Sequence, residues 1–342
     1  MRKLLNTLYI NQDEAYLHLK GNNVAVSVDY DDIGMVPLIN LENIVTFGRA
    51  GASPALISSC LEKNIGLTFM SPEGQFLGRI TGTVDGNVLL RKQQYRDADD
   101  ERVSLQISRN LITGKLFNQR WMIERFVREH KLSASDPFAK LGQEFKQTIG
   151  DVRGATNLDT LRGIEGNVAH DYFALFDRFI LNPGSNFQFE ARTRRPPLNR
   201  VNALLSLGYA LLAAECSSAL AMVGLDPYVG FMHQDRPGRV SLALDLMEEM
   251  RGLMVDRLVV KMINKRIIKP THFEIRENGA VMLTETGRKV FLTQWQSAKQ
   301  EKMLHPFLKE KVAWGLVPYI QALLLARYLR KDLDEYPPLL WK

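Results

Sequence analysis

Four side chains of this 342-residue chain could together hold a metal ion. Glu165 opens one predicted helix, and His233 lies in a loop rich in Gly, Pro and Arg. Asp245 and Glu248 lie on the helix predicted directly after that loop. Carboxylates with one imidazole suit Mg²⁺ and, somewhat better, Mn²⁺. Such an ion stabilises charge on a phosphoryl oxygen and helps to form an oxygen nucleophile, so we predict metal-dependent chemistry on a phosphodiester.

The predicted helix that carries Glu165 is amphipathic. At about 3.6 residues per turn, Glu165 shares a face with four apolar side chains. These are Val168, Ala169, Tyr172 and Phe176. Its carboxylate should therefore lie near the core, where an ionised group needs a cation, an arginine or protonation. The metal-ligand hypothesis stands beside the alternative of a salt bridge to a buried arginine.

Asp245 and Glu248 are three residues apart and project side by side from one helix. Taken alone, such a pair is also typical of a solvated surface, and a single histidine is also typical of a structural hydrogen bond. Because the loop of His233 leads directly into the helix of the two acids, we expect the three side chains to converge. Arg251 follows Glu248 by three residues and could orient its carboxylate or contact a phosphate.

Arginines are concentrated just before a long apolar segment. Within nine residues lie Arg192, Arg194, Arg195 and Arg200. Phosphates accept the bidentate fork of arginine well, so we predict phosphate contacts here, with salt bridges to neighbouring helices as the alternative. The sequence has no GxxxxGK[ST] or GxGxxG motif, which leaves nucleoside-triphosphate hydrolysis without support. It has no Cys-x-x-Cys or paired-histidine spacing, which argues against a structural zinc site.

Charge is distributed unevenly along the chain, whose formal net charge is +6. Residues 1–90 carry 6 Lys and Arg against 9 Asp and Glu, a net charge of −3. The remaining residues therefore carry +9, and they include every candidate metal ligand. This asymmetry indicates an anionic partner for the C-terminal part of the chain.

Residues 1–90 are predicted to form a small β domain with one helix. Turns are predicted at 21–22 and 31–32, and Ser53 is the predicted N-cap of a helix that extends to Lys63. The predicted strands are 4–10, 15–19, 23–28, 43–47, 66–70 and 76–82.

Residues 103–342 are predicted to form a larger, all-α domain that carries the metal site, after a polar linker at 91–102. The predicted helices lie near 104–130, 139–150, 164–181, 200–223, 241–265 and 306–332. One hairpin is expected between 272 and 283, where Asn278 and Gly279 indicate a two-residue turn. The predicted fold class is therefore α+β with two domains.

The cellular setting follows from composition. The apolar run 201–225 is interrupted by Asn, Glu and Ser residues, so we predict a buried helix rather than a membrane helix. The N-terminus lacks the apolar core of a signal peptide. Cys60 and Cys216 match no metal spacing and are expected to be buried thiols. We therefore expect a cytoplasmic protein without membrane association.

In this order, the motifs resemble the Cas1 family, the CRISPR-associated integrases and endonucleases of spacer acquisition. The resemblance runs through Gly163-Ile164-Glu165-Gly166, Arg195-Pro196-Pro197-Leu198-Asn199, Gly208-Tyr209, His233 and Asp245-Leu246-Met247-Glu248. It includes the acidic N-terminal region and so covers essentially the whole chain. The start of the sequence, Leu-Leu-Asn-Thr-Leu-Tyr, is similar to the version found with type I-C systems.

The resemblance implies that Glu165, His233 and Glu248 hold the metal and that Asp245 supports them. The family often has Asp at the position of Glu248, whose side chain reaches one methylene further. The implied phosphate contacts are Arg192, Arg194, Arg195 and Arg251. The family also implies a homodimer formed mainly through the N-terminal β domain, with two such dimers flanking a dimer of the small partner Cas2.

The implied reaction is integration of captured DNA. A 3′-hydroxyl at the end of a double-stranded fragment attacks a phosphodiester at the edge of a CRISPR repeat, and nicking follows if water replaces that hydroxyl. His233 would coordinate as a neutral imidazole, so activity should fall on acidification. Two other hypotheses stay open. One is an idle DNA-binding architectural protein whose acids only pair with arginines, and the other is a generic metal-dependent phosphodiesterase or RNase.

Overall fold

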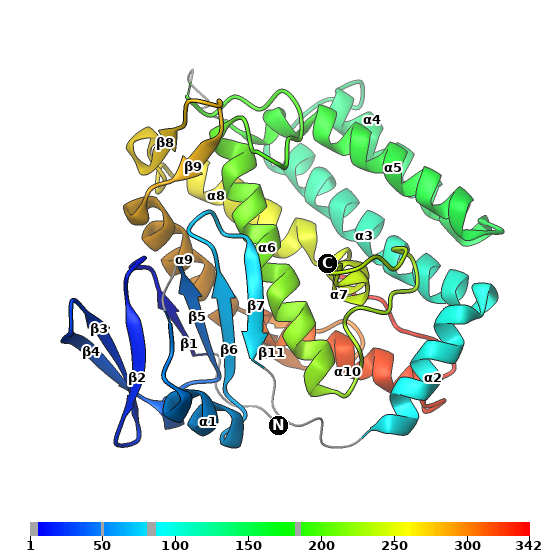
Figure 1. Cartoon of the computed structure of the whole chain (residues 1–342). Coiled ribbons are helices and arrows are strands. Elements are labelled where there is room, and N and C mark those ends of the chain that lie inside the picture. The colour runs from blue at the N-terminus through cyan, green and yellow to red at the C-terminus, as the bar shows by residue number, and fades with distance from the viewer. Residues whose placement is uncertain (1–5, 49–50, 81–86, 182–185) are drawn as a thin grey trace.

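A computed structural model of the chain describes residues 6–48, 51–80, 87–181 and 186–342. The N-terminal region is built on β-sheets, and the larger C-terminal region is mainly helical (Figure 1). The predicted mixed α+β class is therefore confirmed at this level.

Two sheets make up the N-terminal region. One is antiparallel and consists of β2 (Tyr16–Lys20), β3 (Asn23–Val28) and β4 (Asp31–Pro37). The other has the strand order β1 (Thr7–Ile10), β5 (Asn43–Phe47), β6 (Gly66–Met70) and β7 (Phe76–Ile80). In this second sheet β1, β5 and β6 are parallel and β7 is antiparallel. A small core of aliphatic side chains, separate from that of the helical region, lies between the sheets and α1 (Pro54–Glu62).

Most of the predicted N-terminal elements are confirmed. Ser53 caps α1 by accepting a hydrogen bond from the backbone N–H of Leu56 at 3.2 Å, as its position before Pro54 predicts. The turn predicted at 31–32 is wrong, because these residues open β4 and the chain turns earlier, at Asp29 and Tyr30, both with positive φ. Strand β4 is exposed along almost its whole length, so it lacks the alternation that identifies a half-buried strand. Residues 4, 5, 81 and 82 of the predicted strands lie outside the described residues.

The predicted linker at 91–102 is helical instead. Its residues belong to α2 (Val88–Asp99) and to the first turn of α3 (Glu101–Glu129). The polar composition suggests an exposed linker, but some of these side chains are buried and form hydrogen bonds with buried backbone groups. Gln94, for example, is fully buried and donates hydrogen bonds to the carbonyl oxygens of Asp226 (2.8 Å) and Val229 (3.0 Å).

Long helices form most of the C-terminal region. Besides α2 and α3 they include α4 (Pro137–Gly154), α5 (Leu158–Ala174), α6 (Arg200–Met222), α7 (Ser241–Met247), α8 (Arg257–Asn264), α9 (Glu285–Gln300) and α10 (Val317–Leu329). A π-helical turn, η4 (Arg251–Asp256), joins α7 to α8, so the predicted helix at 241–265 is not continuous. Short 3₁₀ turns lie at Leu38–Asn40, Phe176–Phe179, Pro270–His272 and Trp314–Leu316.

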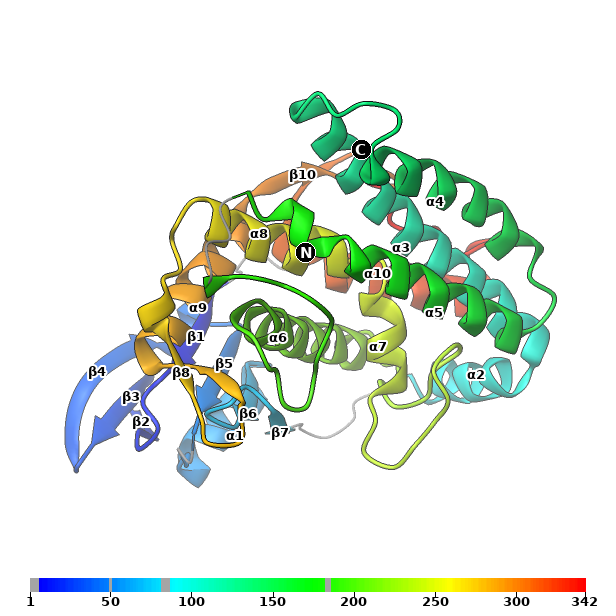
Figure 2. The same cartoon turned by 90° about the horizontal axis from the view of Figure 1, so that it is seen from above.

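Helix α6 lies between the N-terminal sheet and helices such as α3 and α5, and Figure 2 views it nearly end-on. By length and composition alone α6 could cross a membrane, but 61% of its most apolar stretch is buried inside the protein. It packs against α7, α10 and β9. The predicted buried helix at 200–223 is confirmed.

The C-terminal region is not all-α. A hairpin joins β8 (Phe273–Ile275) to β9 (Val281–Leu283), and a second small sheet pairs β10 (Lys302–Leu304) with β11 (Lys311–Ala313). The first hairpin was predicted, but three residues rather than two separate the paired Arg276 and Ala280, with Gly279 at φ 77°. Helix α9 was not predicted, and α10 begins 11 residues later than the predicted start at 306 because β11 and a 3₁₀ turn occupy the intervening chain.

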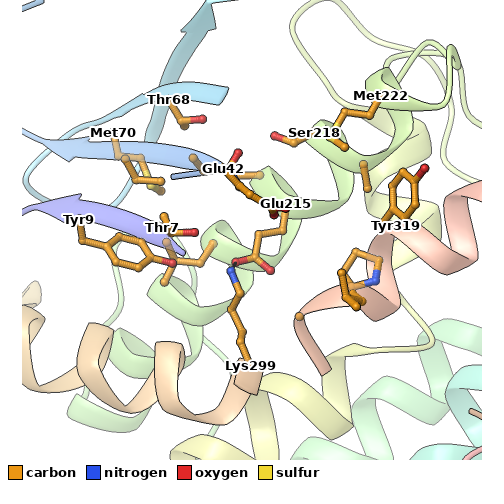
Figure 3. Close-up of a pocket in the computed structure, with 18 residues that line it drawn as sticks. Thr7, Tyr9, Glu42, Thr68, Met70, Glu215, Ser218, Met222, Lys299 and Tyr319 are labelled. Atoms are coloured by element: carbon orange, nitrogen blue, oxygen red, sulfur yellow. Dashed lines mark hydrogen bonds and ion pairs between the residues drawn. The ribbon is translucent and has the colours of Figure 1, made fainter. Parts of the chain in front are cut away.

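A small cavity of about 60 Å³ lies where the N-terminal sheet meets α6 and α9 (Figure 3). Beside it, Lys299 Nζ lies 2.5 Å from Glu215 Oε1, which also accepts a hydrogen bond from Trp295 Nε1 at 3.2 Å. Burial raises the pKa of Tyr9, on β1, to about 12. None of the predicted site residues lines this cavity, and the buried ion pair joins α6 to α9 within the C-terminal region.

Candidate active site

The carboxylate of Asp245 holds the loop that carries His233. Asp245, on α7, is fully buried. Its oxygens accept hydrogen bonds from three consecutive backbone N–H groups, those of Phe231 at 2.7 Å, Met232 at 3.1 Å and His233 at 3.0 Å. Asp245 Oδ1 also lies 2.6 Å from His233 Nδ1. Because a carboxylate accepts hydrogen bonds, the neutral ring donates from Nδ1 and keeps its lone pair on Nε2.

Glu165 and Glu248 both contact the ammonium group of Lys115. Lys115 lies on α3, which packs against α5 and α7, the helices that position the two acids. Its Nζ contacts Glu165 Oε1 and lies 2.9 Å from Glu248 Oε2. The side chains of Lys115 and Glu248 are 4% and 3% exposed, whereas that of Glu165 is 24% exposed. Glu165 therefore has a buried cationic partner, but the partner is a lysine rather than the arginine of the alternative hypothesis.

Sequence reasoning missed Lys115, although α3 contains a signal that could have identified it. Leu111, Leu116 and Ile123 are fully buried on this helix, and Lys115 is buried among them. A charged side chain at a buried position of an apolar helix needs a partner of opposite charge. The pattern could have pointed to Lys115 as a partner for one of the candidate acids.

Glu248 stays ionised despite its burial. Burial by itself raises the pKa of this carboxyl group, but the charges of Arg251 and Lys115 outweigh it and lower the pKa to about 2. Arg251 Nη2 lies 2.9 Å from Glu248 Oε1. Glu248 and Asp245 are therefore both buried and paired, which excludes the solvated-surface alternative for these acids.

The predicted ligands are neighbours in an ion-paired arrangement rather than a coordination shell. Within the part of the chain that the structure describes, no three His, Cys, Asp or Glu side chains form a group that could hold a metal ion as they stand. Lys115 contacts Glu165 and Glu248, while the Nδ1 of His233 faces Asp245. The structure thus links Glu165 to Glu248 and His233 to Asp245, with Glu248 and Asp245 one turn apart at the end of α7.

A buried tyrosine and aspartate support two of the predicted phosphate-binding arginines. The guanidinium carbons of Arg192 and Arg251 lie 5.5 and 5.4 Å from the ring centroid of Tyr209. The hydroxyls of Tyr209 and Tyr172 donate hydrogen bonds to Asp256 at 2.5 and 3.0 Å. Burial raises the pKa of Asp256 to about 6, against the opposing effect of these hydrogen bonds and of the arginine charges.

A groove of about 700 Å³ adjoins this cluster, and its lining combines apolar side chains with a group of arginines. Seven arginines line it: Arg192, Arg194, Arg195, Arg239, Arg251, Arg276 and Arg288. Glu73 is on the same surface and pairs with Arg276 at 3.1 Å. The groove contains all four predicted phosphate contacts, and Arg251 connects it to Glu248.

The four predicted phosphate contacts differ in how the protein holds them. Arg194 and Arg195 are exposed. Arg192 is partly buried, and its fork donates hydrogen bonds to Asn202 Oδ1 at 2.9 Å and Ser206 Oγ at 3.1 Å. Burial lowers the pKa of Arg192 to about 10. Arg194 and Arg195 are therefore the most accessible of the four, while Arg192 and Arg251 are held by protein groups.

A family model described as CRISPR associated protein Cas1 matches residues 8–297. The chain belongs to the Cas1 family. The resemblance on which the sequence analysis relied is therefore confirmed, while the type I-C subtype stays a prediction. Curated Cas1 relatives span the whole chain. The CRISPR-associated endonuclease Cas1 2 of Rhodospirillum rubrum and Cas1 1 of Chlorobaculum tepidum are each 43% identical, over 350 and 343 aligned residues, with both chains fully covered in each case.

Solved structures agree with this Cas1 fold. A casposase bound to integration product has a TM-score of 0.85 at 21% identity, covering 99% of this chain and 95% of the other. The Cas1 protein of Thermotoga maritima has a TM-score of 0.81 at 24% identity, covering 97% and 99%. A chain of a Cas6-RT-Cas1–Cas2 complex has a TM-score of 0.80 at 24% identity, and the match covers 98% of this chain and 36% of the other. At these identities the likeness shows the fold alone.

Proposed function

We propose that this Cas1 family member is a divalent-metal-dependent DNA endonuclease and integrase that inserts captured fragments into a CRISPR array. The single observation that carries the proposal is the meeting of Glu165 and Glu248 at one buried cation, beside an arginine-lined groove. Relatives at 43% identity over the full length bear the name CRISPR-associated endonuclease, which supports the same reaction class.

The donor chemistry of the site fits Mg²⁺ or Mn²⁺, with Glu165, His233 and Glu248 as the holding residues. Two carboxylates already share one cationic partner, and the imidazole keeps Nε2 available as a donor. Among the described residues, Glu248 Oε2 has no aligned hydrogen bond, although Lys115 Nζ is 2.9 Å away. Such an ion would neutralise charge on the phosphoryl oxygens and favour an ionised oxygen nucleophile.

The residues of the chain bind and orient the DNA. Arg194 and Arg195 supply exposed guanidinium groups for the phosphates of the duplex, and Arg251 brings positive charge next to Glu248. In the proposed strand transfer, the 3′-hydroxyl oxygen forms a bond to phosphorus while the bond from phosphorus to the leaving 3′-oxygen breaks. One phosphodiester replaces another, the attacking hydroxyl loses a proton and the leaving oxygen gains one, so the reaction needs no external energy source.

The proposal includes its partners and its setting. The substrates are a double-stranded DNA fragment and the CRISPR repeat, and the active assembly contains a homodimer of this chain with a dimer of the small partner Cas2. Among proteins of the same fold, one structure is a Cas6-RT-Cas1–Cas2 complex and another is a casposase bound to integration product. A cytoplasmic location follows from a DNA substrate.

One observation favours a second candidate function. Lys115 and Arg251 together neutralise Glu165 and Glu248, which is the arrangement expected of an idle architectural DNA-binding protein whose acids only form ion pairs. The two candidates differ in one respect. Removing an acid would abolish strand transfer in an enzyme, whereas it would only alter stability or DNA affinity in a scaffold.

An integration assay separates these functions. The purified chain, its Cas2 partner and Mn²⁺ are incubated with a labelled DNA fragment and a supercoiled plasmid that carries the host repeat array. We expect Glu165→Gln to lower strand transfer at least about 100-fold while duplex affinity stays within about twofold. The matched control is Glu215→Gln, which alters a carboxylate paired with a buried lysine outside the site.

Two outcomes would change the proposal. Duplex binding without strand transfer, by Glu165→Gln and the unaltered chain alike, would support the architectural protein. A fragment with a blocked 3′ end distinguishes integration from hydrolysis, because only integration requires that hydroxyl. Nicking without any joined product, even when the 3′ end of the fragment is free, would indicate a generic phosphodiesterase.

A further inference from the structure

Lys115 occupies the position between the acids that a divalent ion would need. Its ammonium contacts Glu165 Oε1 and lies 2.9 Å from Glu248 Oε2, while Arg251 lies 2.9 Å from the other oxygen of Glu248. Two carboxylates and two cationic side chains leave this cluster formally neutral. Of the two cations, only Lys115 contacts both acids.

A divalent ion and the ammonium group cannot occupy the same position between the two carboxylates. Mg²⁺ binds carboxylate oxygen at about 2.0–2.1 Å, and an ammonium group does so at about 2.7–2.9 Å. Either the metal ion or the ammonium group can contact both carboxylates at once. With Lys115 and Arg251 in place, an added ion would bring two further positive charges into a buried cluster that is already neutral. Like charges in a buried site repel strongly, so uptake of the ion requires the ammonium to leave.

We propose that Lys115 is a built-in counter-ion that competes with the divalent metal for Glu165 and Glu248. In the metal-free protein it holds the two acids together and prevents their repulsion. Metal uptake is then an exchange, in which the ion takes the carboxylate oxygens and the ammonium gives them up. This inference rests on the proposed function, because it concerns the same metal. It adds that Lys115 lowers the affinity of the site for the metal and stabilises the fold when no metal is bound.

The chain offers a matched control for Lys115 at the cavity shown in Figure 3. Lys299 is another buried lysine, 6% exposed, with its Nζ 2.5 Å from Glu215 Oε1. Replacing Lys299 with methionine removes a buried ammonium from a carboxylate, as at Lys115, but in a place that none of the candidate ligands lines. The two substitutions separate a general loss of stability from a specific effect on the metal.

The experiment measures metal binding and stability of the full-length chain rather than catalysis. The variants Lys115→Met and Lys299→Met, together with the unaltered chain, are freed of metal with a chelator and titrated with Mn²⁺ by calorimetry. Melting curves are recorded with and without Mn²⁺. We expect both variants to have a lower Tm without metal. Lys115→Met should bind Mn²⁺ about tenfold more tightly and gain more Tm from it, whereas Lys299→Met should match the unaltered chain in affinity.

Each outcome bears on one part of the argument. Equal or weaker Mn²⁺ binding by Lys115→Met, with normal binding by the unaltered chain, overturns the competition. No Mn²⁺ binding by any of the three proteins overturns the proposed metal site itself. If Lys115→Met does not fold, Lys115→Gln removes the charge but keeps a hydrogen-bond donor, and the same increase in affinity is expected for it.

Discussion

The imidazole of His233 and the carboxylate of Asp245 are 2.6 Å apart, and the same carboxylate accepts three backbone hydrogen bonds from the loop that carries the ring. Asp245 therefore fixes both the position of His233 and the nitrogen that bears its proton. The family resemblance implies a supporting role for this acid, and its geometry is that of a residue acting through His233.

Asparagine at position 245 keeps the size of the side chain but removes its charge. We expect Asp245→Asn to weaken Mn²⁺ binding by about 10–100-fold, because the ring loses a charged acceptor and one of the two oxygens that hold its loop becomes an NH2 donor. Calorimetric titration with Mn²⁺ measures the change. The control is Asp235→Asn in the same loop, where an exposed carboxylate accepts a single backbone hydrogen bond from Gly230 at 3.1 Å. Equal affinities for the two variants would show that His233 is oriented without Asp245.

Glu248 should stabilise the fold in a pH-dependent way. Its folded-state pKa of about 2 lies below the ordinary value of 4.5. A carboxyl group with a lowered pKa contributes stability above the unfolded-state value, and this contribution is lost as the pH falls towards the folded-state value. The difference in unfolding free energy between the unaltered chain and Glu248→Gln should therefore be largest above pH 5. It should shrink between about pH 4.5 and 2, as measured by denaturant titration, and a constant difference would refute the low pKa.

Asp256 should show the opposite dependence. Its folded-state pKa is about 6, raised from 3.8 mainly by burial. The folded protein then binds a proton more tightly than the unfolded chain, so stability falls as the pH rises from about 4 to about 6 and levels off above that. Asp256→Asn removes this dependence. Melting temperatures of both proteins between pH 4 and 7.5 test it, and parallel curves would contradict the raised pKa.

The exposed arginines of the groove should set the salt dependence of DNA binding. Alanine at Arg194 or Arg195 is expected to reduce the slope of log Kobs against log salt by about 0.9 each on B-form DNA. Fluorescence anisotropy with duplex DNA at several salt concentrations measures the slope. Arg178→Ala is the control, because Arg178 does not line the groove and pairs with Asp136 at 2.7 Å. An unchanged slope in the groove variants would exclude phosphate contacts at these positions.

The C-terminal tail should stabilise the helix end next to Glu248. Glu249 is fully buried, contacts the Tyr336 hydroxyl and accepts a hydrogen bond from the backbone N–H of Leu339 at 2.6 Å. Asn118 donates to the Leu339 carbonyl oxygen at 2.7 Å. Deleting residues 336–342 removes these partners of two buried polar side chains, and we expect a loss of about 3–5 kcal/mol in unfolding free energy. Deletion of Lys342 alone is the control, and a similar small effect of both deletions would contradict this role.

Part of the site could be predicted because neighbours in sequence become neighbours in space. The loop of His233 leads into the helix of Asp245 and Glu248, and the structure does bring His233 onto Asp245. The meeting of Glu165 with Glu248 depends instead on the packing of α3 against α5 and α7. Their common partner, Lys115, lies 50 residues before Glu165, and no local pattern specifies that distance.

Elements with a strong local signal in the sequence were predictable, whereas elements defined by their contacts with other elements were not. The sequence of strand β3 has valine at every second position, and the strand pairs on both sides. Ser53 with Pro54 marks the start of α1. Strand β4 has no buried face, so only its pairing with β3 defines it. The polar residues of α2 indicate a linker until the buried contacts of Gln94 are known. In each case the missing information was a tertiary partner.

The most direct test of the account is the location of Mn²⁺ in crystals of the full-length chain, by its anomalous scattering. We predict one strong peak at about 2.0–2.3 Å from carboxylate oxygens of Glu165 and Glu248 and from Nε2 of His233, with the Lys115 ammonium withdrawn from both acids. A saturating Mn²⁺ soak that gives no peak among these three side chains, with Lys115 still bound to both acids, would contradict the account.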